Sequence, residues 1–542
     1  MKTQHFFPVI FAIVLYAETS VVAQNWHWAQ HCGGANFDNT NAVCVDNAGN
    51  SYFGGRYWTP SAIFGQDTLP CGGTYNLFIT KLDVAGNFLW TRTAGGFNTQ
   101  GGAQDFYDLY FDSNSNSIVI TGTITGYTQS IASCSLGDIG GVFLAKIDAE
   151  GNCLWAYKVN HSDASYSLQL YPTSNGNIIM AGRNRYDCYY PGLGTLQAGG
   201  FIAEFQSENG TIKWGRKIVD ENAYIGDIVY RNNSLLTSGG SDVNTMVIDG
   251  KTIPCQGKDA FIARFDTTGH LVWVKTFGGP EDDLGATIGT DTSGNIYTCG
   301  IFKGTAQFGK ISLQNGDRKD VFLAKFDENG EVLWARQLKL TGELYTVHHY
   351  TSSAGETWLN GTFSGTATFG EQVITAETGI EMFVAKYNSS GTFIDVIHSS
   401  NSYNHAFATN EQQELFVAGS FNGTSYFGDK KLISYGSRDG FFARHDAITG
   451  LPKPPEAPDR QLEIYANPTT GVCTVGLPEE LQNQKDLVLR VFDSGGKQVG
   501  EYPLDSSNGK VQLNVEALAQ GIYQVVVSGG GKVVSGKVVF KR

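Results

Sequence analysis

The sequence predicts an all-β protein: a seven-bladed β-propeller whose N-terminal strand closes the last blade, followed by a small C-terminal β-sandwich. Three observations predict this fold. The chain is rich in glycine and aromatic residues and poor in charge, a unit of about 60 residues occurs seven times, and the composition changes after residue 450.

Length and composition limit the class of protein. The chain has 542 residues, too many for one ordinary core, with 67 glycines, 12% aromatic residues and only 17% charged residues. This mixture is typical of many short strands joined by tight turns. The net charge of −14 argues against a nucleic-acid ligand, which needs a basic surface. We expect no cofactor; the charge permits calcium, although a solvated acidic surface explains it as well.

The first 23 residues read as a secretory signal peptide. Lys2 supplies a positive start, Phe6 to Tyr16 form a short apolar core, and Ala23 ends a small-residue cleavage site before Gln24. The apolar core is too short to span a membrane, and no later run reaches 18 apolar residues. We therefore expect the mature chain to be exported, without a transmembrane span.

Nine cysteines are present, and none forms a C-x-x-C pair, so a zinc ribbon is not expected. Export allows disulfides. The odd count leaves at least one thiol unpaired within the chain, and the spacings alone assign no pairs.

The repeated unit contains a strand that begins with phenylalanine, as in "FLAKFDENGEVLWARQL" from Phe322. The equivalent positions are Phe78, Phe143, Phe201, Phe261, Phe322, Phe383 and Phe441. A second element precedes it and ends at Gly55, Gly122, Gly182, Gly239, Gly300, Gly361 and Gly419. Each unit reads as four antiparallel strands, and their radial repetition gives a propeller over residues 24–450.

The two ends of the array predict how it closes. A tryptophan strand follows each of the first five phenylalanine strands, and Ile394 stands for tryptophan after the sixth. The last copy, "FFARHDAITG", has no such strand, while "NWHWAQHC" around Trp28 precedes the first copy. Pairing these two segments removes two exposed strand edges.

Asp327 and Trp334 in the repeated hairpin each allow two interpretations. Asp327 is either an acid or calcium ligand, or a turn residue that accepts bonds from nearby amides. Gln206 and Asn388 replace it in two copies, which favours the turn. Trp334 is either a ligand platform or a packing residue between blades, and Ile394 in its place favours packing.

The repeats resemble the SBBP kind of β-propeller repeat found in exported bacterial proteins. The best copies are Asp291 to Gly300, Asp320 to Asp327 and Trp273 to Gly279, and the likeness covers Gln24 to Gly450. The hairpin is also similar to that of quinoprotein propellers, but their cofactor-contact signature is missing. The SBBP resemblance implies the fold and leaves the activity open.

Residues 451–461 form a Pro-rich linker, and residues 462–542 alternate like a small β-sandwich. This last segment resembles the type A C-terminal sorting domain of the type IX secretion system of Bacteroidota. The motif residues are Asn467, Pro468, Gly471, Asp493, Gly496, Lys497, Gly521 and Tyr523. The resemblance implies handling by the type IX machinery, through the periplasm, to the outer face of the outer membrane or the medium. A plain accessory β-sandwich is the alternative.

No nucleophile, zincin or phosphate-loop motif appears in the chain. His348 and His349 are adjacent on a strand and point to opposite faces, so they do not share a metal. We expect no catalytic set and no metal site.

The loops that lead into the first strand of each blade should converge on one channel mouth. They carry acids and aromatic residues that together suit a glycan, a surface protein or a cation. The acids are Asp38, Asp105, Asp163, Asp220, Asp282 and Asp283; the aromatic residues are Phe106, Tyr166, Tyr224, Tyr345 and Tyr403. The alternative is that the aromatic residues pack between blades and the acids are solvated turn residues.

These features favour a secreted or surface-displayed binding or scaffold protein. An exported hydrolase or lyase acting on glycans at the channel mouth is the alternative. A purely structural surface component is the third interpretation.

Overall fold

The structure is a computed structural model. It describes residues 25–58, 60–71, 75–95, 105–124, 129–137, 140–159, 165–377, 379–448, 462–478, 481, 487–492, 498–504, 509–529 and 532–541. These residues form strands and turns, with no helix among them. The chain divides into an N-terminal unit, Gln24–Ile448, and a C-terminal unit within Thr449–Arg542. The expected signal peptide, its cleavage site at Ala23 and Gln24, and the linker 451–461 lie outside the described residues.

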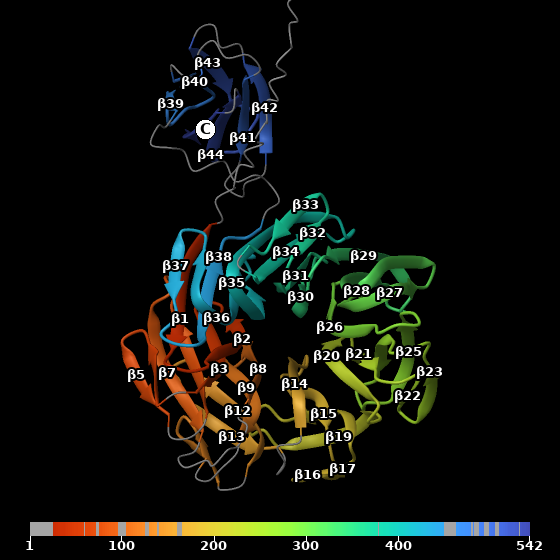
Figure 1. Ribbon diagram of the computed structural model, residues 1–542. Coiled ribbons are helices and arrows are strands. Elements are labelled where there is room, and N and C mark those ends of the chain that lie inside the picture. Colours follow the sequence, from red (N-terminus) through yellow and green to blue (C-terminus); the bar gives the residue numbers. More distant parts are fainter. Residues whose placement is uncertain are drawn as a thin grey trace, which may run out of the picture. The chain divides into compact units, whose positions relative to one another are not determined.

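In the N-terminal unit, strands pair antiparallel in successive groups of four. The first groups are β2 (Asn39–Val45), β3 (Ser51–Tyr57), β6 (Asn76–Leu82), β7 (Phe88–Gly95); β8 (Asp105–Asp112), β9 (Ser117–Ile124), β12 (Gly141–Asp148), β13 (Cys153–Lys158); and β14 (Ser165–Pro172), β15 (Ile178–Asn184), β18 (Gly199–Phe205), β19 (Ile212–Val219). The next are β20 (Ala223–Arg231), β21 (Ser234–Ser241), β24 (Ala260–Phe265), β25 (Leu271–Phe277); β26 (Leu284–Thr290), β27 (Ile296–Phe308), β28 (Ile311–Phe326), β29 (Val332–Leu340); and β30 (Leu344–Thr351), β31 (Thr357–Phe363), β34 (Glu381–Tyr387), β35 (Phe393–Thr409). Figure 1 shows the groups arranged around a central axis, with the first strand of each group nearest to it.

The first and last strands of this unit share one sheet. β1 (Trp26–Gly33) pairs antiparallel with β38 (Asp439–His445), with Trp28 opposite Arg444 and Cys32 opposite Gly440. β38 pairs with β36 (Leu415–Phe427), which pairs with the second half of β35. The segment around Trp28 therefore lies beside the segment around Phe441, where the sequence places it.

The middle strands of each group carry the core. β6, β18 and β34 are buried at every residue, since both faces of these strands lie against neighbouring sheets. The repeated phenylalanine is inaccessible to solvent, as at Phe322 and Phe383. The phenylalanine strand of the repeat is thus a fully buried strand.

A hairpin between the second and third strands of a group commonly pairs with the last strand of the preceding group. These hairpins are β4 (Ser61–Phe64)–β5 (Asp67–Pro70) on β1, β10 (Gln129–Ile131)–β11 (Cys134–Gly137) on β7, β22 (Thr245–Ile248)–β23 (Lys251–Pro254) on β19, β32 (Thr366–Phe369)–β33 (Gln372–Thr375) on β29, and the end of β36 with β37 (Lys430–Ile433) on β35. The extended ends of β27 and β28 make the same contact through Gln307 and Gly278. β16 (Cys188–Tyr190) and β17 (Gly194–Leu196) form a two-stranded sheet of their own. The sequence reads these segments only as variable, so this exchange of strands is a finding of the structure.

The repeated hairpin turn is shaped by its acidic residue. Asp327 Oδ1 accepts hydrogen bonds from the backbone amides of Asn329 and Glu331, at 2.9 and 2.8 Å. Asn388 makes the equivalent bonds to Ser390 and Thr392. The turn interpretation of Asp327 is therefore confirmed.

The tryptophan of one group packs on the turn glycine of the next group. A Cβ added at Gly86 would lie 2.6 Å from the Trp28 ring, and one at Gly330 would lie 3.1 Å from Trp273. The indole also donates to the neighbouring turn, as from Trp334 Nε1 to the Ser389 carbonyl at 3.2 Å. The packing role predicted for Trp334 is confirmed.

One disulfide is present, and the spacings could not assign it. Cys134 of β11 is bonded to Cys153 of β13, which joins the hairpin to the last strand of its own group. The other seven cysteines are not part of this disulfide.

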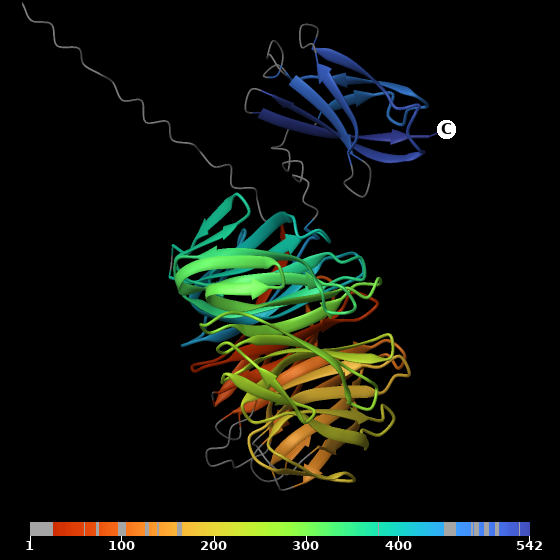
Figure 2. The same ribbon diagram turned by 90° about the vertical axis from the view of Figure 1, so that its right-hand side faces the viewer.

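The C-terminal unit contains two antiparallel sheets that share a core (Figure 2). One sheet is β39 (Glu463–Tyr465), β40 (Val472–Gly476) and β43 (Lys510–Asn514); the other is β42 (Gln498–Leu504), β41 (Leu487–Phe492), β44 (Gly521–Gly529) and β45 (Lys532–Phe540). Val475 from the first sheet and Leu489 and Val525 from the second are fully buried in this core. This is the two-sheet arrangement expected from the alternating sequence. Among the described residues, no helix is long and apolar enough to cross a bilayer.

We expect Gly86→Ala to destabilise the N-terminal unit by about 2–4 kcal/mol, because φ is +84° at Gly86 and the Trp28 ring occupies the place of a Cβ. Gly176→Ala is the matched control, since Gly176 has φ +83° and no atom within 4 Å of the added Cβ. It should cost only about 1 kcal/mol, the backbone part of the effect. Guanidinium unfolding of the full chain measures both, and equal losses would contradict the packing role of Trp28.

Candidate binding face

We call the end of the N-terminal unit where the loops lead into the first strand of each group the mouth face. A continuous series of ring and guanidinium contacts lies on it, and we call this series the aromatic arc. In order of contact its members are Tyr345, Tyr403, Arg438, Phe37, Trp58, Tyr75 and Arg56.

The first half of the arc joins two neighbouring groups. The rings of Tyr345 on β30 and Tyr403 on the second half of β35, the part that pairs with β36, meet edge to face, with their centroids 5.6 Å apart. The Arg438 guanidinium lies 4.5 Å from the Tyr403 centroid and 5.5 Å from the Phe37 centroid. Tyr345 is 49% exposed and Phe37 is 47% exposed, so both rings are available to a ligand.

The second half continues into the first group of the chain. Phe37 stacks on Trp58 at 6.3 Å, and Trp58 contacts Tyr75 at 5.1 Å. The Arg56 guanidinium lies 5.0 Å from the Tyr75 centroid and forms an ion pair with Asp105.

Backbone pairing between two loops holds Arg438 against Phe37. The Arg438 amide donates to the Asn36 carbonyl at 3.2 Å, and the Asp38 amide donates to the Arg438 carbonyl at 2.8 Å. The loop after β1 and the loop before β38 are therefore held together, although they are far apart in the sequence. This backbone pairing places the Arg438 guanidinium beside the Phe37 ring.

Two of the six candidate acids, Asp38 and Asp283, are 1% exposed and shape their own loops. Asp38 accepts the amides of Gly34 and Trp58, both at 2.7 Å. Asp283 accepts the amide of Gly279 at 2.6 Å. The prediction that they face a ligand is wrong for the described structure, because backbone amides occupy both side chains.

Burial raises the pKa of Asp38 to about 6 and that of Asp283 to about 7. In each case a second buried carboxyl lies close by, Asp439 beside Asp38 and Asp259 beside Asp283, and further raises the pKa. Glycines Gly33 and Gly278 allow each pair to approach, since a Cβ there would lie within 2.8 Å of both carboxyls.

The remaining acids are placed differently. Asp105 is paired with Arg56, and burial still raises its pKa. The Asp220 side chain accepts the Asn222 amide at 3.3 Å within its own turn. Asp282 is 44% exposed at its side chain, with Lys258 Nζ at 3.8 Å. Asp163 lies outside the described residues.

The candidate aromatic residues also fall into two sets, those that belong to the arc and those that do not. Tyr345 and Tyr403 belong to the arc. Tyr224 donates its hydroxyl to the Gly285 carbonyl in the next group at 3.0 Å, and Phe106 is buried. The Tyr166 backbone pairs with Arg183, and its side chain is not among those described.

Sequence reasoning missed two half-buried acids on first strands. Asp108 on β8 accepts the Leu170 amide of the next group at 2.8 Å, and Asp227 on β20 accepts the Ile288 amide at 3.1 Å. Burial raises the pKa of each carboxyl to about 7. They connect neighbouring sheets through these bonds.

The two adjacent histidines, His348 and His349, lie on β30. His349 Nδ1 shares a hydrogen bond with Thr287 Oγ1 at 2.5 Å. Burial lowers the pKa of His349 to about 3. Burial also lowers the pKa of His348. Their neutral state near pH 7 follows from their position in the protein interior.

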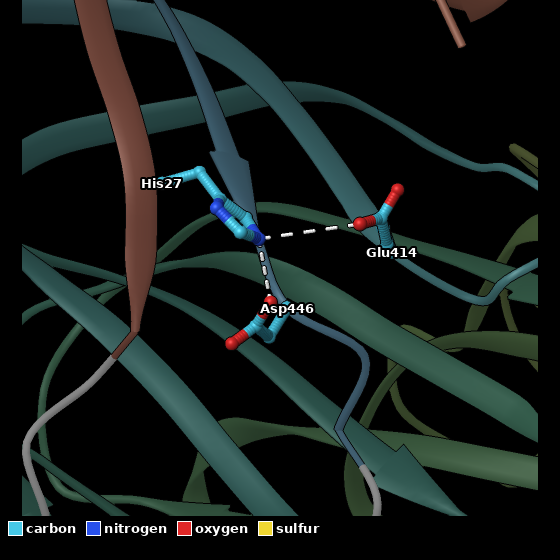
Figure 3. A group of neighbouring side chains, drawn as sticks. All are labelled: His27, Glu414 and Asp446. Carbon is cyan, nitrogen blue, oxygen red and sulfur yellow. Dashed lines mark hydrogen bonds and ion pairs between the residues drawn. The ribbon is translucent and has the colours of Figure 1, made fainter. Parts of the chain in front are cut away.

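A histidine and two carboxylates, His27, Glu414 and Asp446, lie close together (Figure 3). His27 Nε2 lies 2.5 Å from Asp446 Oδ1 and 4.0 Å from Glu414 Oε1. This donor set has the chemistry for a divalent cation. Arg444 bonds to Glu414 at 2.6 Å and Asn25 bonds to Asp446 at 3.0 Å, so these contacts tie β1 to its sheet.

The sorting-motif residues that the structure describes hold the C-terminal unit together. The Asn467 side chain donates through Nδ2 to the Lys537 carbonyl at 2.6 Å and accepts through Oδ1 from the Val539 backbone amide at 2.8 Å. Pro468 follows in a cis peptide. A Cβ at Gly471 would meet Glu516, and Tyr523, two residues after Gly521 in β44, donates its hydroxyl to the Ala519 carbonyl at 2.6 Å. Asp493, Gly496 and Lys497 lie outside the described residues.

Residues 463–541 match the family described as the secretion system C-terminal sorting domain. The C-terminal unit is thus a sorting domain of the type IX secretion system, and the protein is exported to the cell surface or the medium. No curated protein matches the chain significantly.

Three solved structures are similar to the chain. BamB from Moraxella catarrhalis is 12% identical, with 74% of this chain and 82% of that chain covered and a TM-score of 0.30. The quinohemoprotein alcohol dehydrogenase ADHIIG from Pseudomonas putida is 10% identical, with 83% and 81% covered and a TM-score of 0.36. A protein of unknown function from Dyadobacter fermentans is 10% identical, with 77% and 99% covered and a TM-score of 0.37.

We expect Asp283→Asn to change how stability depends on pH. The folded pKa is about 7 against a usual value of 3.8, so the folded protein binds more protons between these values. The stability that Asp283 contributes is therefore full below about pH 4 and is lost as the pH rises to about 7, at up to about 1.4 kcal/mol per pH unit. Asp283→Asn removes this slope. Urea unfolding from pH 4.5 to 8 measures it, and Asp282→Asn is the exposed control. Parallel curves for the wild type and Asp283→Asn would refute this assignment.

Proposed function

We propose that this exported chain is a glycan-binding protein that displays its aromatic arc on the mouth face of a closed seven-bladed propeller. The arc is the observation that carries the proposal. Partly exposed rings from neighbouring sheets form one continuous contact series, and planar rings stack on the apolar faces of sugar rings. A protein that is exported to the cell surface meets polysaccharides there.

The four-stranded groups supply the blades of the proposed ring. In this arrangement, β1 completes the last blade, and the β4–β5 hairpin of the first blade adds to β1 across the seam. We assign the repeats to the SBBP kind on the motifs in the sequence.

A binding role rather than a catalytic one is favoured by how the acids are used. Asp38 and Asp283 are bonded to backbone amides, and Asp105 is paired with Arg56. A glycan hydrolase needs one carboxyl to donate a proton to a leaving group and another to activate water or attack carbon. A hydrolase or lyase is the alternative, and release of new sugar ends from a bound polymer would favour it.

A glycan array and a pull-down on insoluble polysaccharides test the binding role with the full chain. We expect Phe37→Ala and Tyr345→Ala each to weaken binding at least about fivefold, the loss of about 1 kcal/mol typical of an exposed contact ring. Tyr186→Ala is the matched control, because Tyr186 is 64% exposed and lies outside the arc. Equal binding by all three variants would exclude the arc, and capture of surface proteins alone would replace the glycan as ligand.

Delivery depends on the C-terminal unit. We expect removal of residues 462–542 to leave the N-terminal unit in the periplasm, because the sorting domain is then absent. Cell fractionation with a periplasmic marker measures this. Normal surface delivery of the truncated chain would contradict a sorting role for the C-terminal unit.

A further inference from the structure

We propose that Arg438 binds an anionic group, so that the ligand of the aromatic arc is an acidic polysaccharide carrying carboxylate or sulfate groups. This inference rests on the proposed glycan-binding function and narrows it. It concerns the one cation at the centre of the arc and the reason for its position there.

Arg438 has no ion pair or side-chain hydrogen bond with any residue that the structure describes. Its Nε is buried without a partner, while the guanidinium lies near the rings of Tyr403 and Phe37. A partly buried, uncompensated charge is costly unless something neutralises it. The ring contacts compensate only part of that cost.

The geometry leaves the guanidinium able to bind a second partner. Aromatic rings contact a guanidinium through its face, whereas its N–H groups point outward in its plane. Those N–H groups form the fork that binds carboxylate or sulfate oxygens in pairs. The same side chain can therefore remain stacked in the arc and bind an anion at its edge.

Charges around Arg438 do not supply the missing anion. Asp439, the next residue, has its Oδ2 occupied by His31 Nδ1 and the Tyr435 amide, both at 3.0 Å. Burial, and then the positive charge of Arg438, lower the pKa of His405 to about 4, so this histidine is neutral near pH 7. No carboxylate among the described residues forms an ion pair with Arg438, and the histidine whose pKa it lowers is neutral.

Arg56, the other arginine of the arc, shows the contrast. It also lies near a ring, Tyr75, but Asp105 neutralises it through an ion pair. One arginine of the arc is thus compensated within the chain and the other is not. In a protein with a net charge of −14, an anionic ligand needs such a local cation to bind at all.

The test compares polymers that differ only in charge. Polygalacturonate is paired with its fully methyl-esterified form, and dextran sulfate with dextran, so each pair shares one backbone. Binding of the full chain is measured by calorimetry for the wild type, Arg438→Gln and Arg438→Lys. Arg185→Gln serves as the control because Arg185 is exposed and lies outside the arc.

We expect the wild type to bind at least one charged polymer at least about tenfold more tightly than its neutral partner. Arg438→Gln should remove this preference, Arg438→Lys should keep part of it, and Arg185→Gln should leave it unchanged. Preference for polygalacturonate assigns the carboxylate, and preference for dextran sulfate assigns the sulfate. An unchanged melting temperature for Arg438→Gln would show that the loss is local.

Two results would overturn the inference. Equal binding to the charged and neutral polymers, unaffected by Arg438→Gln but weakened by Phe37→Ala, would remove the anionic ligand and leave the glycan-binding function in place. If the protein bound none of the four polymers and Phe37→Ala had no effect on the glycan array, both the anionic ligand and the glycan-binding function would be excluded.

Discussion

The contact between a tryptophan in one sheet and a turn glycine in the next is the constraint on which the N-terminal unit depends. The glycine is needed twice, for a positive φ and for the space that the indole fills. The indole N–H then bonds to a carbonyl of the same turn, as from Trp90 Nε1 to Ala149 at 3.0 Å. Six tryptophans, from Trp28 to Trp334, make this contact with the glycine of the following sheet, whereas the sixth sheet has Ile394 in the tryptophan position. The contact joins Trp28 at the start of the chain to Gly86, and so fixes the last sheet against the first.

Repetition explains why much of the fold could be predicted. Asp327, Trp334 and Phe322 each occur in nearly every copy, so their common role is structural, and the structure gives them turn, packing and core positions. The pairing of β1 with β38 followed from counting which copy lacked a strand. The Cys134–Cys153 bond could not be predicted, since both positions depend on how one hairpin folds back on its own sheet.

The candidate site was predicted less well, for a physical reason. The spacing of acids and aromatic residues shows that they lie on mouth loops, but not which way each side chain turns. Asp38 turns inward to cap backbone amides, whereas Tyr345 turns outward. Arg438 carried no signal at all, because only the fold brings it to Phe37. Sequence reasoning finds what the repeats share, including the aromatic position of Tyr345 and Tyr403, whereas Arg438 stands at a position in which the repeats differ.

We call the place where β1 and β38 of the last sheet lie beside the first sheet the seam. The aromatic arc lies across this seam, and this has a structural cause. Phe37 precedes β2, the first strand of the first sheet, and Arg438 precedes β38 in the last sheet. The two meet because β1 is a strand of that last sheet, which brings the loop at Asn36 alongside the loop before β38. Elsewhere, the loop that leads into a sheet comes from the sheet just before it in the chain. At the seam the two loops come from opposite ends of the N-terminal unit, so their sequences can change without altering the shared repeat. A cation without a partner is tolerated there, since the backbone pairing on either side of Arg438 holds it in place independently of its charge.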